Sequence, residues 1–98
     1  MPPRRQSSKS NGDLKTVEFC FEDSPGLRVC LAGSFNNWDP YAHQMQEDPA
    51  GGLYRLALDL PPGKHEYRFV IDDEWRTDPQ NPDTVTNAYG SVNSVVTV

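Results

Sequence analysis

Apolar and polar residues alternate with a period of two along most of this 98-residue chain. A period of two places successive side chains on opposite faces of a β-strand, so each such segment has one face to bury. Turn-forming Gly, Pro, Asn and Asp interrupt the alternation about every eight to twelve residues. Helical spacing could also fit the leucine run at 53–60, but Gly51-Gly52 and Pro61-Pro62-Gly63 bound it to about ten residues, which favours a strand. The pattern predicts an all-β fold, an immunoglobulin-like antiparallel β-sandwich of about seven short strands. Its clearest strands are 15–22, 27–32, 53–60, 64–72 and 92–98.

Turn chemistry suggests how neighbouring strands pair. The DSPG turn at 23–26 follows the first strand directly, and we expect it to join 15–22 and 27–32 as an antiparallel hairpin. The acidic residues at 72–74 form the next tight turn, which leads into a short strand at EWRT. The segment 34–49 has no clean period, so no strand is predicted there.

Composition divides the chain into a tail and one domain. Residues 1–13 are rich in Pro, Ser and basic side chains, and we expect a disordered N-terminal tail there. Residues 14–98 form a single expected domain with six basic and 13 acidic side chains. An acidic domain argues against nucleic acid and against an anionic membrane surface, since both need a positive face. No apolar run approaches about 18 residues, so no transmembrane helix is expected.

The start of the chain also lacks the hydrophobic segment of a secretory signal, so we expect a cytoplasmic protein. In a reducing compartment Cys20 and Cys30 are expected as free, half-buried thiols, although a disulfide between two neighbouring strands stays open. Because the chain begins at Met1 and ends with the last strand, we expect no catalytic domain in it.

Residues that could carry catalysis are few. The carboxylates of Asp72, Asp73 and Glu74 lie in a tight turn, where a solvated turn is the simpler interpretation than a glycosidase pair. A calcium site formed by Asp72, Asp73 and Asp78 matches no known loop spacing. His43 and His65 have no Ser or Cys partner in a catalytic motif. We therefore expect no enzyme activity, no cofactor and no metal.

Two tryptophans stand outside the inward-facing sets. Trp38 follows the strand that ends at Gly33, and Trp75 comes just after a tight turn. A flat aromatic ring surrounded by polar side chains suits the C–H face of a sugar, and this contact needs no charge on the protein. Burial in the core is the alternative, because tryptophan is usually a buried residue.

Three motifs in order carry a resemblance to a known family. AGSFNNWDP, LDLPPGKHEYRFVIDDEWRTDPQNP and YGSVNSVVTV together resemble a carbohydrate-binding module of family 48, the glycogen- and starch-binding type. The chain is similar from about residue 15 to 98 to the glycogen-binding domain of the AMP-activated protein kinase β subunit. It is also similar to modules that precede the catalytic barrel in branching and debranching enzymes.

The resemblance implies a β-sandwich that binds α-1,4-linked glucans, such as glycogen, starch or maltooligosaccharides, without hydrolysing them. It implies a stacking platform, a basic residue in place of the family's lysine, an edge residue in place of the family's leucine, and two residues that orient hydroxyls. The stacking platform is Trp75 with Trp38, and the basic residue is Arg68. The edge residue is Tyr89, and the residues that orient hydroxyls are Ser91 and Asn93. It also implies that Asp73 replaces the usual turn glycine, which aspartate permits because it tolerates positive φ.

Alternatives remain for several of these residues. Trp38 could pack instead of stacking, and Arg68 could pair with Glu66 or Asp72 at the surface. Asn36 and Asn37 are expected to make turn hydrogen bonds to backbone rather than sugar contacts. The implied partners are an α-glucan and a glycogen-metabolism enzyme or kinase subunit. A protein-interaction module of the same fold, without sugar binding, is the alternative function, because exposed tryptophans also form protein hot spots.

Overall fold

The computed structural model describes residues 14–98, so the tail expected at 1–13 lies outside the described residues. The described part contains eight β-strands: β1 (Lys15–Glu22), β2 (Val29–Gly33), β3 (Gln46–Glu47), β4 (Leu53–Leu60), β5 (Lys64–Ile71), β6 (Glu74–Arg76), β7 (Thr84–Thr86) and β8 (Val92–Thr97). Within it, no helix has the length and hydropathy needed to cross a membrane.

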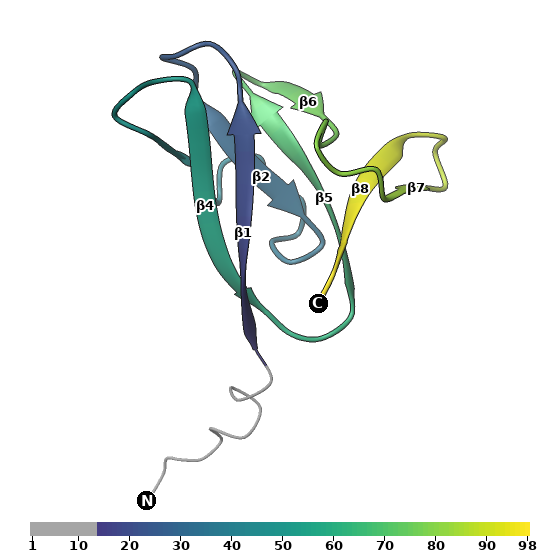
Figure 1. The fold of residues 1–98 in the computed structure, drawn as a ribbon. Coiled ribbons are helices and arrows are strands. Elements are labelled where there is room, and N and C mark those ends of the chain that lie inside the picture. Colours follow the sequence, from purple (N-terminus) through teal and green to yellow (C-terminus); the bar gives the residue numbers. More distant parts are fainter. Residues whose placement is uncertain (1–13) are drawn as a thin grey trace, which may run out of the picture.

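The strands form two antiparallel sheets, which overlap as two layers in Figure 1. One sheet has the order β1-β4-β3, and the other has the order β2-β5-β8-β7 with β6 added on β5. The predicted all-β sandwich is confirmed. The segment 34–49, for which no strand was expected, contributes only the two-residue strand β3 beside β4.

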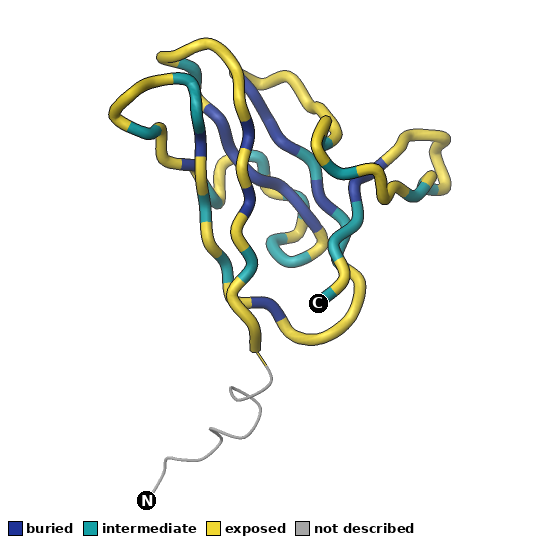
Figure 2. Tube along the Cα trace, viewed as in Figure 1, coloured by how far each residue is buried: buried dark blue, intermediate teal, exposed yellow. Residues whose placement is uncertain are grey.

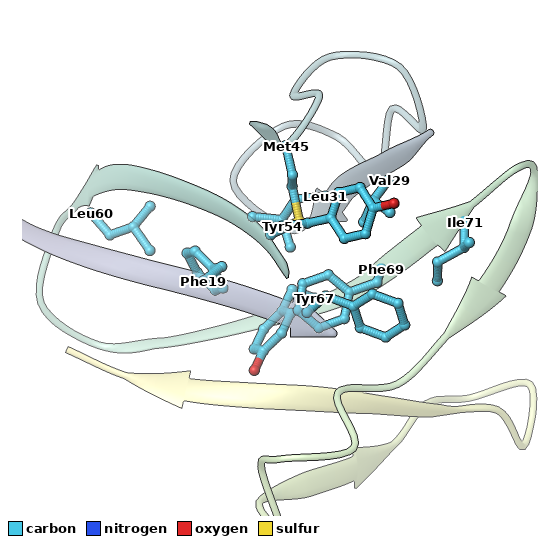
Figure 3. Packing of buried hydrophobic residues seen from close by; sticks show 10 residues of the cluster. Phe19, Val29, Leu31, Met45, Tyr54, Leu60, Tyr67, Phe69 and Ile71 are labelled. Carbon is cyan, nitrogen blue, oxygen red and sulfur yellow. The ribbon is translucent and has the colours of Figure 1, made fainter. Parts of the chain in front are cut away.

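The core lies between the two sheets, where the inward faces of the alternating strands meet. Figure 2 shows buried and exposed residues alternating along β1, whose pattern matches the predicted faces. The packed side chains in Figure 3 come from both sheets and from the segment before β3. The fully packed cluster is Phe19, Phe21, Val29, Leu31, Met45, Tyr54, Leu60, Tyr67, Phe69 and Ile71.

The predicted hairpin between 15–22 and 27–32 is wrong. β1 pairs with β4 along its whole length, from Lys15 opposite Leu60 to Glu22 opposite Leu53. β2 pairs instead with β5 in the other sheet. Residues 23–28 therefore cross between the layers, and the hydroxyl of Tyr54 holds this crossing by donating to the Ser24 carbonyl at 2.7 Å. Alternation fixes which face of a strand points inward, but it does not select the strand's neighbour.

Gly33 ends β2 where the backbone must pass closest to β5. A Cβ at this position would lie 2.5 Å from the Glu66 carbonyl oxygen and 2.7 Å from the ring of Phe35. Only a residue without a side chain fits there, which explains why the strand ends in glycine before the loop that carries Trp38.

The cysteines are both free, as expected, and the disulfide alternative is not realised. The expectation that both are half-buried is wrong: Cys20 is exposed on β1, while Cys30 is buried on β2. Each alternates with core residues, so both lie on outer faces of different sheets. Burial raises the pKa of both thiols, and the neighbouring Glu18 carboxylate raises that of Cys20 further.

Candidate functional site

A second, smaller apolar cluster covers the outer face of the five-stranded sheet. Cys30, Ala32 and Val70 are buried there although they point away from the main core. The side chain that covers them is Trp38, which packs against this cluster and is itself partly buried. Trp38 is therefore neither a plug of the core between the sheets nor a free ring. It lies on the outside of the sheet and leaves part of its surface open.

The loop that carries Trp38 is held in shape by Asn36. The side chain of Asn36 accepts from the Gly33 backbone N–H at 3.0 Å and donates to the Leu31 carbonyl at 2.9 Å. The Gly33 carbonyl in turn accepts from the backbone N–H of Trp38 at 2.9 Å. The expected turn role of Asn36 is thus confirmed. Asn37 and Trp38 both have positive φ, 58° and 59°, a conformation that is rare for a bulky residue and that these bonds stabilise.

Polar contacts among Arg28, Tyr41 and Asp73 join the Trp38 loop to the turn before Trp75. The hydroxyl of Tyr41 donates to the Asp73 carboxylate at 3.1 Å, and the Arg28 guanidinium meets the same oxygen at 3.1 Å. Arg28 also lies over the ring of Tyr41, with its guanidinium carbon 5.3 Å from the ring centroid. The hydrogen bond to Asp73 raises the pKa of Tyr41, so the phenol keeps the proton that it donates to the Asp73 carboxylate.

Trp75 reaches the same outer face from β6. It stands opposite Val70 in the antiparallel register, and Val70 belongs to the cluster under Trp38. Cross-strand partners project to the same side of a sheet, so Trp75 faces outward with Val70. Asp72 and Asp73 form the turn with φ of 47° and 73°, as expected for a turn that aspartate tolerates. Trp75 is 40% exposed, which leaves a broad ring surface free.

Arg68, Asn93 and Glu66 form a hydrogen-bonded row across β5 and β8. The Nε of Arg68 donates to Asn93 Oδ1 at 2.7 Å, and Asn93 Nδ2 donates to Glu66 Oε1 at 2.9 Å. Within residues 14–98, no ion pair joins Arg68 to Glu66 or Asp72, so that alternative is wrong. Asn93 is only 5% exposed. Its amide joins the two charged side chains and has one further N–H and one further lone pair.

The loop between β7 and β8 supplies the remaining predicted residues. The side chain of Asn87 accepts from the backbone N–H groups of Tyr89 and Ser91 at 2.9 and 3.0 Å. Gly90 takes a φ of 83° between them, so the loop closes tightly on itself. Tyr89 is 93% exposed and Ser91 is also exposed. Both side chains are therefore open to solvent on a loop that the Asn87 side chain holds closed.

The two tryptophans, the hydrogen-bonded row of β5 and β8, and side chains of the β7–β8 loop line one hollow of about 460 Å³ on the outer face of the sheet. The six residues singled out from the sequence meet there from four separate segments. Sequence reasoning missed two further lining residues, Glu66 and Asn87. In the sequence, Glu66 shares the polar face of its strand with Arg68, and Asn87 precedes a loop that contains glycine. Neither feature distinguishes these two residues from other polar residues on strands and in loops. The full lining is Trp38, Glu66, Arg68, Trp75, Asn87, Tyr89, Ser91 and Asn93.

The acidic turn and the histidines have structural contacts instead. Asp72 accepts the backbone N–H of Arg28, and Asp78 accepts the hydroxyl of Tyr67 at 2.7 Å. Across residues 14–98, no group of three or more His, Cys, Asp or Glu side chains is arranged to hold a metal ion. His43 contacts the amide of Asn36, and His65 contacts the Pro61 carbonyl.

Comparison with known families agrees with this arrangement. A family model described as the glycogen recognition site of AMP-activated protein kinase matches residues 16–98, nearly the whole described part. The chain belongs to this family. The match spans both sheets and every residue that lines the hollow.

Similar proteins of this family include kinase subunits and a plant protein. The chain is 40% identical over 73 residues to the 5'-AMP-activated protein kinase subunit beta-1 of Bos taurus, covering 74% of this chain and 25% of that protein. It is 33% identical over 93 residues to Protein FLOURY ENDOSPERM 6, chloroplastic, of Oryza sativa subsp. japonica, covering 95% of this chain and 17% of that protein. The chain thus spans a quarter or less of these two relatives.

A solved structure has the same fold at low identity. The maltogenic amylase from S. marinus matches with a TM-score of 0.67 and 19% identity, over 85% of this chain and 13% of the amylase. The same β-sandwich fold therefore also occurs as a small part of a much larger chain.

Proposed function

We propose that residues 14–98 form a module that binds α-1,4-linked glucans without hydrolysing them. The observation that carries the proposal is the convergence of two partly exposed tryptophans on one hollow with a row of polar side chains beside them. Membership in a glycogen-recognition family supports the same ligand class.

The aromatic side chains supply the area for sugar binding. Trp38 and Trp75 face outward, and their rings can stack on the C–H faces of glucose units. Because Trp38 is fixed by its packing on the sheet and Trp75 by the β5–β6 turn, little entropy is lost when a sugar covers them. Tyr89 extends the apolar edge from the β7–β8 loop.

The polar side chains orient the sugar. The guanidinium of Arg68 uses Nε for Asn93 and keeps its other N–H groups for hydroxyl oxygens. Ser91 offers a hydroxyl from the loop, and Asn93 offers its remaining N–H. Because the row is already hydrogen-bonded, these donors keep their positions before a ligand arrives.

The composition of the hollow supports binding rather than cleavage. Glycoside hydrolysis generally needs two carboxyl groups that face each other across the sugar. Among the residues that line the hollow, Glu66 is the one carboxylate, and its Oε1 accepts from Asn93. Incubation with amylose is therefore expected to release no reducing ends.

Tryptophan fluorescence gives a direct test, because the two tryptophans of the chain both line the hollow. Titration with maltoheptaose or β-cyclodextrin is expected to change the emission, and cellohexaose, with the opposite anomeric linkage, serves as the control. An unchanged emission at millimolar maltoheptaose would contradict glucan binding.

A protein-interaction module is the second candidate, favoured by the 93% exposure of Tyr89. In that case neither sugar changes the fluorescence, although the fold is intact. As a glucan binder, the module would recruit a partner such as a kinase subunit or a glycogen-metabolism enzyme to the polymer, where several weak sites gain by avidity. The cytoplasmic location stays a prediction, since one relative is named as chloroplastic.

A further inference from the structure

A second hollow of about 800 Å³ also has Trp75 in its lining. It shares Trp75, Arg68 and Ser91 with the first hollow, so the two meet along these side chains. Its remaining lining comes from the end of β1 with the residue after it, from the end of β6 with the segment after it, and from the start of β8. These residues are Phe21, Glu22, Asp23, Arg76, Thr77, Pro79 and Val92.

A fork in the five-stranded sheet creates this hollow. β8 pairs with β5 from Lys64 to Tyr67, and β6 pairs with the same edge of β5 from Phe69 to Ile71. Arg68 lies at the point where neither strand pairs with β5. Figure 1 shows β8 diverging from β5 while β6 stays beside the upper end of β5. The second hollow is lined both by Arg68, which lies at this fork, and by residues at the end of β1.

The chemistry of the second hollow suits a neutral ligand rich in hydroxyls. The carboxylates of Glu22 and Asp23 are acceptors, while the Arg76 guanidinium and the Thr77 hydroxyl are donors, and all four residues are exposed. The two carboxylates balance the guanidinium groups of Arg68 and Arg76, so the lining carries no net charge that would select an anion or a cation. Val92, 41% exposed, adds an apolar side chain to the lining.

We infer that the second hollow binds further glucose units of an α-glucan whose first units occupy the hollow of Trp38 and Trp75. The inference rests on the proposed function. It assigns Trp75 to both hollows, so that a chain passes from one side of its ring to the other. It also assigns Arg76 and Thr77 to hydroxyl recognition and makes chain length a determinant of affinity.

The experiment compares maltotriose with maltodecaose by calorimetry on the wild type and on two variants, Arg76→Ala and Thr77→Ala. A longer chain gains some affinity from additional binding registers alone, and both variants keep that part of the gain. We expect each variant to bind maltotriose like the wild type and to lose about threefold in affinity for maltodecaose, the effect of about one hydrogen bond.

The control is Thr84→Ala, an exposed threonine in a separate hollow beside Glu66 that contains no aromatic side chain. It should leave both affinities unchanged. An unchanged ratio of the two affinities in both Arg76→Ala and Thr77→Ala would overturn the second hollow while leaving the proposed function intact. Failure of the wild type to bind either sugar would overturn both.

Discussion

Replacing Trp75 with alanine separates the ring's role in binding from its role in folding, because Trp75 is 40% exposed. A tryptophan side chain offers about 250 Å², so about 100 Å² is open to a ligand and about 150 Å² packs on the protein. At about 25 cal/mol per Å², covering the open part is worth about 2.5 kcal/mol, or about 70-fold in Kd.

The packed part sets the cost in stability. About 150 Å² corresponds to at most about 4 kcal/mol, and a compact unfolded chain reduces this to about 2–3 kcal/mol. Trp75→Ala is therefore expected to remain folded at low temperature and to bind maltoheptaose about 70-fold more weakly. Calorimetry measures the Kd, and urea denaturation measures the free energy of unfolding.

The matched control is Leu14→Ala, which removes a 39% exposed apolar side chain outside the hollow. It should leave the Kd unchanged. If Trp75→Ala is folded and still binds within threefold of the wild type, the ring is not a stacking platform and the calculation from its open area is refuted.

Three further variants test other parts of the site and the core. Tyr89→Ala removes a side chain that is 93% exposed; urea denaturation should find stability within about 0.5 kcal/mol of the wild type, while calorimetry should find glucan binding about fivefold weaker. Asn93→Ala removes the hydrogen bonds to Arg68 and Glu66. It should lower the free energy of unfolding by about 2 kcal/mol, which is less than the full loss of two hydrogen bonds to charged groups because water replaces them in part. An unchanged free energy of unfolding would contradict the positioning role of Asn93. Burial raises the pKa of the Tyr67 phenol, and its bond to Asp78 raises it further. The stability that the protonated phenol provides is thus fully present below its ordinary pKa of about 10 and is lost as the pH rises above it. The difference in free energy of unfolding between wild type and Tyr67→Phe should shrink from pH 8 to 11, and a constant difference would argue against a buried phenol.

Alternation predicted the fold well because burial of one face is a local property of each strand. Phe19, Phe21, Tyr67 and Phe69 all point into the core as the period of two requires. Strand pairing is not a local property, and the predicted hairpin between 15–22 and 27–32 was wrong for that reason. Both strands bury an apolar face, so alternation does not distinguish their partners. The sheet that each strand joins depends on contacts across the whole sandwich.

The residues singled out from the sequence lie together in the structure, but the sequence did not indicate how they are held in place. The six residues from the sequence line one hollow, yet nothing in the pattern indicated that Trp38 packs on an outer cluster that includes Cys30. Nor did it indicate that Asn93 is buried between two charged side chains. Such details depend on contacts between segments that lie far apart in the chain, and local residue patterns do not predict those contacts.

The most direct measurement of the central claim is an amide NMR titration of the folded chain with maltoheptaose. Glucan binding in the hollow predicts progressive shifts for Trp38, Trp75 and Ser91, including both indole N–H signals, while amides of the three-stranded sheet such as Thr16 stay unchanged. Absence of shifts at both tryptophans at millimolar sugar, with the fold intact, would contradict the account.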